Sequence, residues 1–439
     1  MRGKRKKFIT VLCLIVCLVC GCTGKDRAEL PNVGILTADG GEGGAVQTAD
    51  SSGSPEVVTL NPVTGFEAPV ITEDNKKNSQ VSMGDLMADK KAAGITTDAV
   101  KRCMKEQQGR YMYDMMDTDL HTLYAEILLI VRSHAKDIMV SSTDSDDLQT
   151  AFMCVFQDHP ELFWIEGYSY GCYSKNGKVT ALTFSGKYSY SKEECDLFQC
   201  LIDDWVDKCV GGLPINADEY EKVKYAYQYV ILHTDYVLGA DDNQNILSVM
   251  IGGMSVCQGY AKALQYVLNE MGIPCTMVIG KVRGGEGHAW DLVNIDGAYY
   301  YVDPTWGDSG YLSASGMNVS KQGEINYNYL NVTSDEIGRS HIADNVVAMP
   351  RCIATDDNYY VREGRCIEYY DEAVISRLFD EARTSGGRCV SFKCSDDPVY
   401  RECVVKLLEE RRVFALLPSG VNSVDYTTDD VLNVLTFWF

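Results

Sequence analysis

The chain has 439 residues, of which 46% are hydrophobic and 23% are charged, as in globular proteins with room for two or three domains. Its formal net charge is −22, which argues against binding to nucleic acid and against electrostatic docking on anionic lipid.

Residues 1–22 have the pattern of a lipoprotein signal peptide. Basic residues occupy positions 2 and 4–7, and an apolar run over 8–20 follows; these are the two parts of a secretory leader, and the run is too short for an ordinary transmembrane helix. The motif LVCGC at 18–22 resembles a bacterial lipobox, in which Cys22 would be the lipidated residue. We therefore expect an exported protein that a lipid anchors to the outer face of the bacterial cytoplasmic membrane. The alternative is a soluble secreted protein with ordinary cleavage nearby.

Two segments follow before the centre of the chain. Residues 23–98 are rich in Gly, Ser, Thr, Asp and Pro and show no apolar period, which predicts a disordered tether. Residues 99–217 predict a helical/β domain, with helices over 120–136, 147–157 and 192–210 and a hairpin around Asn176 and Gly177. His159 precedes a proline, so a structural turn is favoured over a site residue at this position.

The chain has 17 cysteines, which is a high count. Outside the leader they form no CxxC motif and no Cys/His spacing typical of zinc sites. They either pair in part as disulfides or survive as thiols. For an exported protein with scattered cysteines we favour an oxygen-poor habitat.

Residues 218–345 predict the central domain, whose clearest helix starts near Cys257. Ser255 and Gln258 have the spacing of a capping box, and apolar residues then recur with the helical period up to Met271. Gly272 and the proline at 274 end the helix. Cys257 therefore lies in the first turn, where the helix dipole and unpaired N–H groups favour a thiolate.

A β-hairpin is expected further along the domain. Asp296 and Gly297 predict a type I′ turn between strands over 288–295 and 298–303. In the register that this turn sets, alternate side chains share a face. His288 and Asp303 are then diagonal neighbours, about 7 Å apart at the backbone, whereas Asp291 points to the opposite face.

These three residue types suit acyl transfer. A thiolate at Cys257 attacks a carbonyl carbon, the imidazole of His288 takes and later donates a proton, and the carboxylate of Asp303 orients the ring. Taken singly, each is more often structural: a buried cysteine, a core histidine, or an aspartate that starts a turn. Their combination favours a thiol triad.

A resemblance to a known family leads to the same residues. The stretches VCQGYAKAL (256–264), GHAWDLVNIDGAYYYVDPTW (287–306) and YLNVTSDEIGRSH (329–341) resemble the transglutaminase-like core of the papain-like cysteine enzymes. The resemblance implies an α+β fold in which a helix bearing the cysteine packs on an antiparallel sheet. It also implies Cys257 as nucleophile, His288 as general base and acid, and Asp303 as the orienting carboxylate.

Further site residues are expected from position alone. Gln244, Asn245 and Tyr236 are candidates for the oxyanion donor that must join the backbone N–H of the nucleophile. Trp290 and Trp306 are expected to pack around the site. No metal site and no cofactor is expected, because no calcium loop of the DxDxDG type and no other ligand pattern appears in the sequence.

Residues 346–439 predict a small C-terminal α/β domain. Helices are expected over 370–383 and 398–411, a strand over 388–392, and an apolar segment over 431–439. No catalytic pattern appears there, so its expected role is packing or the recognition of a substrate or partner.

The sequence thus predicts an enzyme that acts on peptide or protein amide bonds through a thioester. Hydrolysis or deamidation is favoured over transglutamination, because water is always present. The expected partner is a protein or peptide substrate, including cell-wall peptides. The alternative is a non-catalytic surface binding lipoprotein that keeps the same fold.

Overall fold

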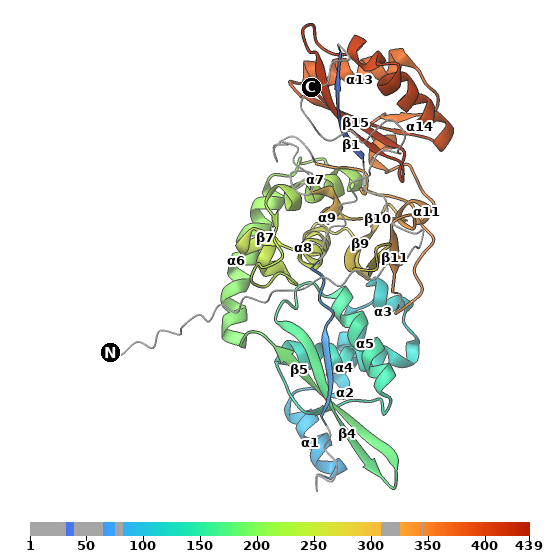
Figure 1. Ribbon diagram of the computed structural model, residues 1–439. Coiled ribbons are helices and arrows are strands. Elements are labelled where there is room, and N and C mark those ends of the chain that lie inside the picture. Colours follow the sequence, from blue (N-terminus) through green and yellow to red (C-terminus); the bar gives the residue numbers. More distant parts are fainter. Residues whose placement is uncertain (1–31, 39–64, 75–81, 309–324, 345) are drawn as a thin grey trace, which may run out of the picture.

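The computed structural model describes residues 32–38, 65–74, 82–308, 325–344 and 346–439. Three folded units follow one another along the molecule: an N-terminal domain, a central domain and a C-terminal domain (Figure 1). Each combines helices with a sheet, so the expected α+β class is confirmed. The leader, including Cys22, lies outside the described residues. Within the described ranges, no helix is both long enough and apolar enough to cross a membrane.

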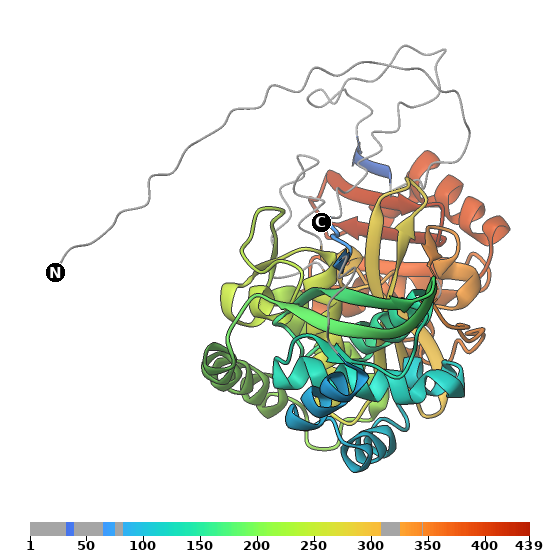
Figure 2. The ribbon, with the colours of Figure 1, turned by 90° about the horizontal axis from the view of Figure 1, so that it is seen from below.

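The N-terminal domain packs helices against a four-stranded sheet of order β2-β4-β5-β3. Helix α6 (Lys192–Gly211) packs with the central core through residues such as Ile202 and Cys209. The helices of the N-terminal domain are α1 (Met83–Ala92), α2 (Thr97–Glu106), α3 (Tyr111–Met115), the 3₁₀ turn η1 (Thr118–Leu120), α4 (His121–Ser133) and α5 (Ser145–Asp158). Its strands are β2 (Val70–Asp74), β3 (Ile138–Met139), β4 (Ile165–Lys175) and β5 (Lys178–Tyr188). From below, these helices and the β4–β5 hairpin lie at the near end of the molecule (Figure 2).

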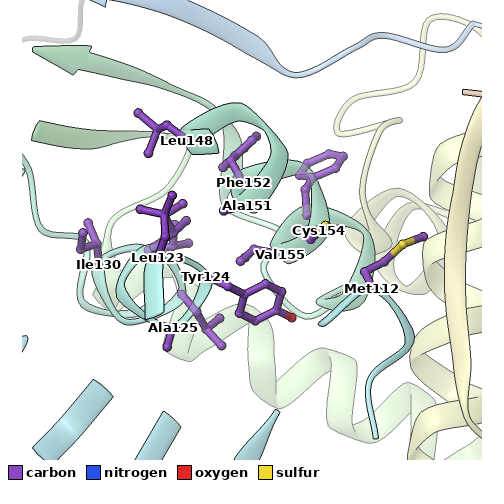
Figure 3. Close-up of a cluster of buried hydrophobic side chains, with 14 of the residues drawn as sticks. Met112, Leu123, Tyr124, Ala125, Ile130, Leu148, Ala151, Phe152, Cys154 and Val155 are labelled. Carbon is purple, nitrogen blue, oxygen red and sulfur yellow. The ribbon is translucent and has the colours of Figure 1, made fainter. Parts of the chain in front are cut away.

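The expected hairpin and helices of this domain are confirmed. Asn176 and Gly177 connect β4 and β5 with φ of 53° and 76°, the positive values that a type I′ turn requires. The apolar faces of α4 and α5 meet, and side chains such as Leu123, Ala151 and Val155 gather between the two helices (Figure 3).

The central domain carries a four-stranded antiparallel sheet of order β10-β9-β8-β11. The strands are β8 (Cys275–Val282), β9 (Gly287–Ile295), β10 (Ala298–Val302) and β11 (His341–Ala343). The remaining elements are α7 (Glu219–Leu232), β6 (Asp235–Tyr236), the π-helical turn η2 (Ser248–Gly252), β7 (Met254–Ser255), α8 (Cys257–Glu270), α9 (Pro304–Gly307) and α11 (Ser334–Ile337). Helix α8 packs on β8 and β9, as the resemblance implied.

The C-terminal domain is a five-stranded sheet with helices. Its strand order is β1-β14-β15-β13-β12. The elements are β1 (Asn32–Thr37), α12 (Tyr359–Arg362), β12 (Cys366–Ile367), α13 (Glu372–Thr384), β13 (Cys389–Cys394), α14 (Asp397–Val404), the π-helical turn η3 (Val405–Glu409), the 3₁₀ turn η4 (Arg412–Ala415), β14 (Ser423–Asp429) and β15 (Val434–Trp438). The expected helices and strands correspond to α13, α14, β13 and β15, whereas β14 was not expected.

The expectation of a structureless tether over 23–98 is wrong for three parts of that stretch. Strand β1 pairs antiparallel with β14 at the edge of the C-terminal sheet, and β2 pairs in parallel with β4. Helix α1 starts with a capping box between Ser82 and Asp85. The two strands gain their structure from main-chain hydrogen bonds to distant strands. A local composition with no apolar period does not show such pairing.

One buried carboxylate joins the N-terminal domain to the central sheet. Asp158 accepts hydrogen bonds from the backbone N–H groups of Met112 and Tyr113, at 3.1 and 2.9 Å, and from the Tyr124 hydroxyl at 3.0 Å. The hydroxyl of Thr276 on β8 donates to the same carboxylate at 3.2 Å. The stretch around His159 therefore has the structural role that was favoured for it.

None of the thirteen cysteines in the described ranges forms a disulfide. The sequence left open whether these cysteines pair as disulfides or remain thiols, and in the described part of the structure they are thiols.

Candidate active site

Cys257 is the first residue of α8 and is fully buried. The residue before it, Val256, is the N-cap and provides no side-chain hydrogen bond to the helix. The N-cap side chain thus does not bind the first turn of α8, whereas the backbone of Cys257 hydrogen-bonds the phenol of Tyr236. The N–H groups of a first helical turn form a site for negative charge, because they add to the positive end of the helix dipole.

The capping box expected at the start of this helix is wrong. The Ser255 hydroxyl lies 2.6 Å from that of Ser248 and donates to the Asn243 carbonyl at 3.1 Å. The side chain of Gln258 donates to the Gln244 carbonyl at 2.9 Å. Both side chains bind the loop before the helix, because the helix begins two residues after the serine.

His288 and Asp303 meet as the hairpin register predicts. Strands β9 and β10 pair in the expected register, and Nε2 of His288 lies 2.7 Å from Oδ2 of Asp303. The other carboxylate oxygen, Oδ1, accepts from the N–H groups of Thr305 and Trp306 at 2.9 and 3.1 Å, so Asp303 also caps α9. Because both oxygens are held, the carboxylate is a fixed support for the imidazole.

A second histidine, His341, was not expected at the site. Its Nε2 lies 3.1 Å from Oδ2 of Asp303, the oxygen that pairs with His288. Its Nδ1 lies 2.8 Å from the hydroxyl of Ser340. Strand β11 brings it there by pairing with β8. The only signal in the sequence was its place at the end of the third family-like stretch, and no local pattern links it to the hairpin.

The charges of the site depend on one another. Burial by itself lowers the pKa of His288, but the carboxylate of Asp303 and the side chain of Cys257 raise it to about 10. Burial by itself raises the pKa of Asp303, yet the two histidines hold it well below its usual range. Burial lowers the pKa of His341, so this ring is neutral at physiological pH. The site therefore favours a charged His288 between a carboxylate and a thiol.

The two tryptophans pack where they were expected. The rings of Trp290 and Trp306 lie with their centroids 6.0 and 6.1 Å from that of His288. They lie closer still to His341, at 4.9 and 4.7 Å. Both are buried, so they fix the positions of the two imidazole rings and exclude water from them.

The three oxyanion candidates differ in where their side chains go. Strand β6 places Tyr236 opposite Ser255 in a parallel bridge to β7, and burial, followed by the charges of Cys257 and Asp303, raises the pKa of its phenol. The side chain of Asn245 instead accepts from Leu247 N–H at 2.8 Å, within a turn.

The third candidate, Gln244, is bound elsewhere. Its amide donates to the Gly65 carbonyl at 2.8 Å and accepts from Glu67 N–H at 3.1 Å. Of the three candidates, Tyr236 is the one whose side chain interacts with Cys257.

Asp291 is excluded as the partner of His288. It is fully buried on the face of β9 opposite His288, where its carboxyl group lies beside the thiol of Cys275. Burial, together with the charge of Asp303, raises its pKa well above the usual range. This environment favours the neutral acid, and the carboxyl points away from His288, so it does not support that ring.

The structure also brings together one group that the sequence spacing did not suggest. His288, Asp303 and His341 each offer a ligand atom, and these atoms lie within 4.8 Å of one another, close enough to hold a metal ion. The same atoms are already used in the two hydrogen bonds to Asp303. A metal would have to replace those hydrogen bonds.

The comparisons with known proteins identify the region that holds this site. Residues 211–304 match the transglutaminase-like superfamily, and this range includes Cys257, His288 and Asp303. Residues 211–304 are thus similar to a transglutaminase-like domain. Proteins with this domain are typically cysteine enzymes. No curated protein matches the chain.

Solved structures show partial similarity to this chain. A transglutaminase is 20% identical over 32% of the chain, with a TM-score of 0.24. A candidate cysteine protease from Cytophaga hutchinsonii is 14% identical over 31% (TM-score 0.21), and menin, described with its binding site for the Mixed Lineage Leukemia protein, is 16% identical over 53% (TM-score 0.22). The chain covers 44%, 62% and 49% of these three proteins, respectively, so less than two thirds of each.

Proposed function

We propose that the protein is a thiol enzyme that acts on peptide or protein amide bonds through a thioester. The observation that supports this most is the pair formed by His288 and Asp303 at 2.7 Å, with Cys257 close enough to help raise the pKa of the imidazole to about 10. A thiol, an imidazole and a carboxylate in this relation form the triad used in acyl transfer.

In the proposed reaction the sulfur of Cys257 attacks the amide carbon, and the C–N bond breaks after a tetrahedral intermediate. His288, which holds the proton, gives it to the leaving nitrogen, so an amine or ammonia departs and a thioester remains. A water molecule then attacks the thioester as His288 takes its proton, and the acid is released with the thiol restored. Asp303 holds the ring through Nε2, which leaves Nδ1 for these proton transfers.

We further propose that the oxyanion is held by the backbone N–H of Cys257 and the hydroxyl of Tyr236. The backbone of Cys257 hydrogen-bonds the phenol of Tyr236, so the two groups lie side by side, and an oxyanion would replace this contact by accepting from both. Donors in a buried site are worth more than in water, because the surroundings screen charge poorly.

His341 is proposed as a positioning residue. It holds the same oxygen of Asp303 as His288 does, and it does not need to touch the substrate. Its neutral ring would donate from Nε2 while Ser340 donates to Nδ1, an arrangement that the hydrogen-bond network favours.

Hydrolysis or deamidation is the favoured outcome because water is the available acceptor, and an amine acceptor would give a cross-link instead. We propose peptides or proteins outside the cell as substrates, including cell-wall peptides, with the enzyme anchored through a lipid at Cys22. The contrary proposal is a surface binding protein that keeps the fold without catalysis.

Alkylation of the full-length protein with iodoacetamide, read residue by residue by mass spectrometry, tests the proposal. Cys257 should be alkylated selectively, and His288→Ala should abolish this selectivity. Cys200 is an exposed thiol on α6 and serves as the reference in the same sample. Release of ammonia or amine from peptide substrates, lost in Cys257→Ala, would identify the reaction. Equal effects of His288→Ala on both cysteines would contradict the activated nucleophile and favour the binding protein.

A further inference from the structure

A short segment from the upstream part of the chain crosses the central domain beside the triad. It consists of residues 65–67, which directly precede the stretch leading to β2. A Cβ atom on Gly65 would lie 2.8 Å from Cγ1 of Val256 and 2.9 Å from Cδ2 of Leu238. This segment therefore touches the residue that precedes Cys257.

The same segment also touches the residue that precedes His288. A Cβ atom on Gly287 would lie 2.6 Å from Cδ1 of Phe66, so the aromatic ring lies directly on this glycine. Phe66 is half-buried and packs at the border of the N-terminal and central cores. Residues 65 and 66 thus span from the cysteine side of the site to the histidine side.

A glutamine side chain holds the main chain of this segment in both directions. The Gln244 amide donates to the Gly65 carbonyl at 2.8 Å and accepts from the Glu67 N–H at 3.1 Å. Its own backbone carbonyl accepts from Gln258, the residue after Cys257, at 2.9 Å. Paired contacts of this kind, to one carbonyl and one N–H, are how proteins hold extended peptides without regard to side chains.

The triad lies covered in this arrangement. Cys257, His288 and Asp303 are each 0% exposed, so a substrate carbonyl has no access to the sulfur until something moves. The segment of residues 65–67 can move at low cost, because the chain that follows it buries little surface. Glu67 and the residue after it are exposed, and β2 is mostly exposed. The ring of Phe66 is its main apolar contact.

We propose that residues 65–67 are a built-in strap that occupies the place where the enzyme holds the main chain of a peptide substrate, and that Gln244 is the residue that binds this main chain. The proposal rests on the proposed function of the triad. It deepens that function by naming the substrate class: an extended peptide segment that displaces the strap. Such a segment would carry glycine where Gly65 passes Val256 and Leu238, and a bulky apolar side chain in the position of Phe66.

Two variants of the full-length protein loosen the strap. Gly65→Ala places a methyl group against Val256 and Leu238, at a φ of +62°, and Phe66→Ala removes the ring that covers Gly287. Gly94→Ala is the matched control for the first, because Gly94 also has a positive φ, +81°, but has no atom within 4 Å of the added carbon. Thermal unfolding of Gly65→Ala and Gly94→Ala would show that both are folded.

The expected result is that Cys257 reacts with iodoacetamide at least about tenfold faster in Gly65→Ala and Phe66→Ala than in the wild type or Gly94→Ala, with Cys200 unchanged. A synthetic peptide of residues 61–70, NPVTGFEAPV, added to Phe66→Ala should slow the reaction again. The same peptide with alanine at the Gly65 position should not.

Two outcomes separate this proposal from the proposed function. Labelling of Cys257 at the wild-type rate in both strap variants, with a fold intact, would overturn the strap and leave the triad unaffected. Faster labelling in those variants and protection by the peptide, together with no effect of His288→Ala and no amide cleavage, would support the strap as a peptide-binding element and overturn the enzyme.

Discussion

Nε2 of His341 lies 3.1 Å from Oδ2 of Asp303, the oxygen that Nε2 of His288 also approaches. The two imidazole rings share one acceptor, and Trp290 and Trp306 lie against both. The carboxylate therefore cannot turn toward one ring without changing its contact with the other. This sharing makes His341 a second residue that holds the carboxylate of Asp303.

Replacing His341 should weaken catalysis less than replacing His288. His341→Ala should lower kcat/KM by about 10- to 100-fold, the usual cost of losing a partner of a catalytic group, whereas His341→Gln, which keeps an N–H donor, should recover part of the loss. The pH profile of Cys257 alkylation distinguishes positioning from folding, because it should shift in the alanine variant. An unchanged profile with a lower melting temperature would assign His341 a purely structural role.

Two buried aspartates of the same hairpin provide a matched pair. Asp303→Asn should lower kcat by roughly 10³–10⁴-fold, because the amide no longer stabilises the charged ring of His288. Asp291→Asn should leave kcat within a factor of about two, because Asp291 lies on the opposite face of β9. Amide hydrolysis assays on both variants test this, and similar losses in the two would contradict the choice of Asp303.

The pKa of His288 predicts an unusual pH dependence. Since the ring of His288 stays protonated up to a pKa of about 10, its effect on Cys257 should persist between pH 6.5 and about 9. The ratio of the Cys257 alkylation rate to that in the same protein with His288→Ala should therefore change little over this range. The measurement is best made in the Phe66→Ala variant, with Cys200 as the exposed reference. A ratio that falls steeply below pH 9 would contradict the raised pKa of His288.

Asp291 predicts a pH-dependent stability. Burial raises its pKa well above the usual range. A group with a raised pKa in the folded state supports folding below its unfolded pKa, near 4, and this support is lost as the pH rises through the folded value. The melting temperature of Asp291→Asn should therefore exceed that of the wild type by an amount that grows from pH 4 to pH 8. A difference that shrinks over this range would contradict a protonated Asp291.

Tyr236→Phe tests the proposed oxyanion donor. Loss of the hydroxyl should lower kcat by roughly 100-fold with a small change in KM, as when one such donor is removed from a related site. Asn245→Ala is the control, because Asn245 forms a turn contact with Leu247 and should not affect kcat. Equal rates for Tyr236→Phe and the wild type would leave the donor to be found among other groups near Cys257.

The hairpin could be predicted from sequence because its geometry is local. A two-residue turn at Asp296 and Gly297 determines which side chains face each other, and the observed register agrees with this. The same rule separated Asp303 from Asp291. The cap of α8 was predicted wrongly. A serine can cap a helix that begins directly after it, but the hydroxyl of Ser255 contacts Ser248 and Asn243 instead.

Other features depend on contacts between distant parts of the chain and could not be predicted. His341 reaches Asp303 because β11 pairs with β8. Gln244 was chosen by its position before the nucleophile, yet its side chain binds residues about 180 positions earlier, with separations of 177 and 179. Glycine-rich and polar composition upstream predicts disorder, whereas β1 and β2 gain structure from strands elsewhere.

The pairing of β1 with β14 has a consequence for where the proposed enzyme would work. Asn32 is already part of the C-terminal sheet, and the ten residues from 23 to 32 can span at most about 35 Å when fully extended. With the lipid that we propose at Cys22, the C-terminal domain, which forms one end of the molecule (Figure 1), would be held close to the bilayer. The protein would then act as a short-range enzyme with a preferred orientation, and only substrates near the membrane surface would come within its reach.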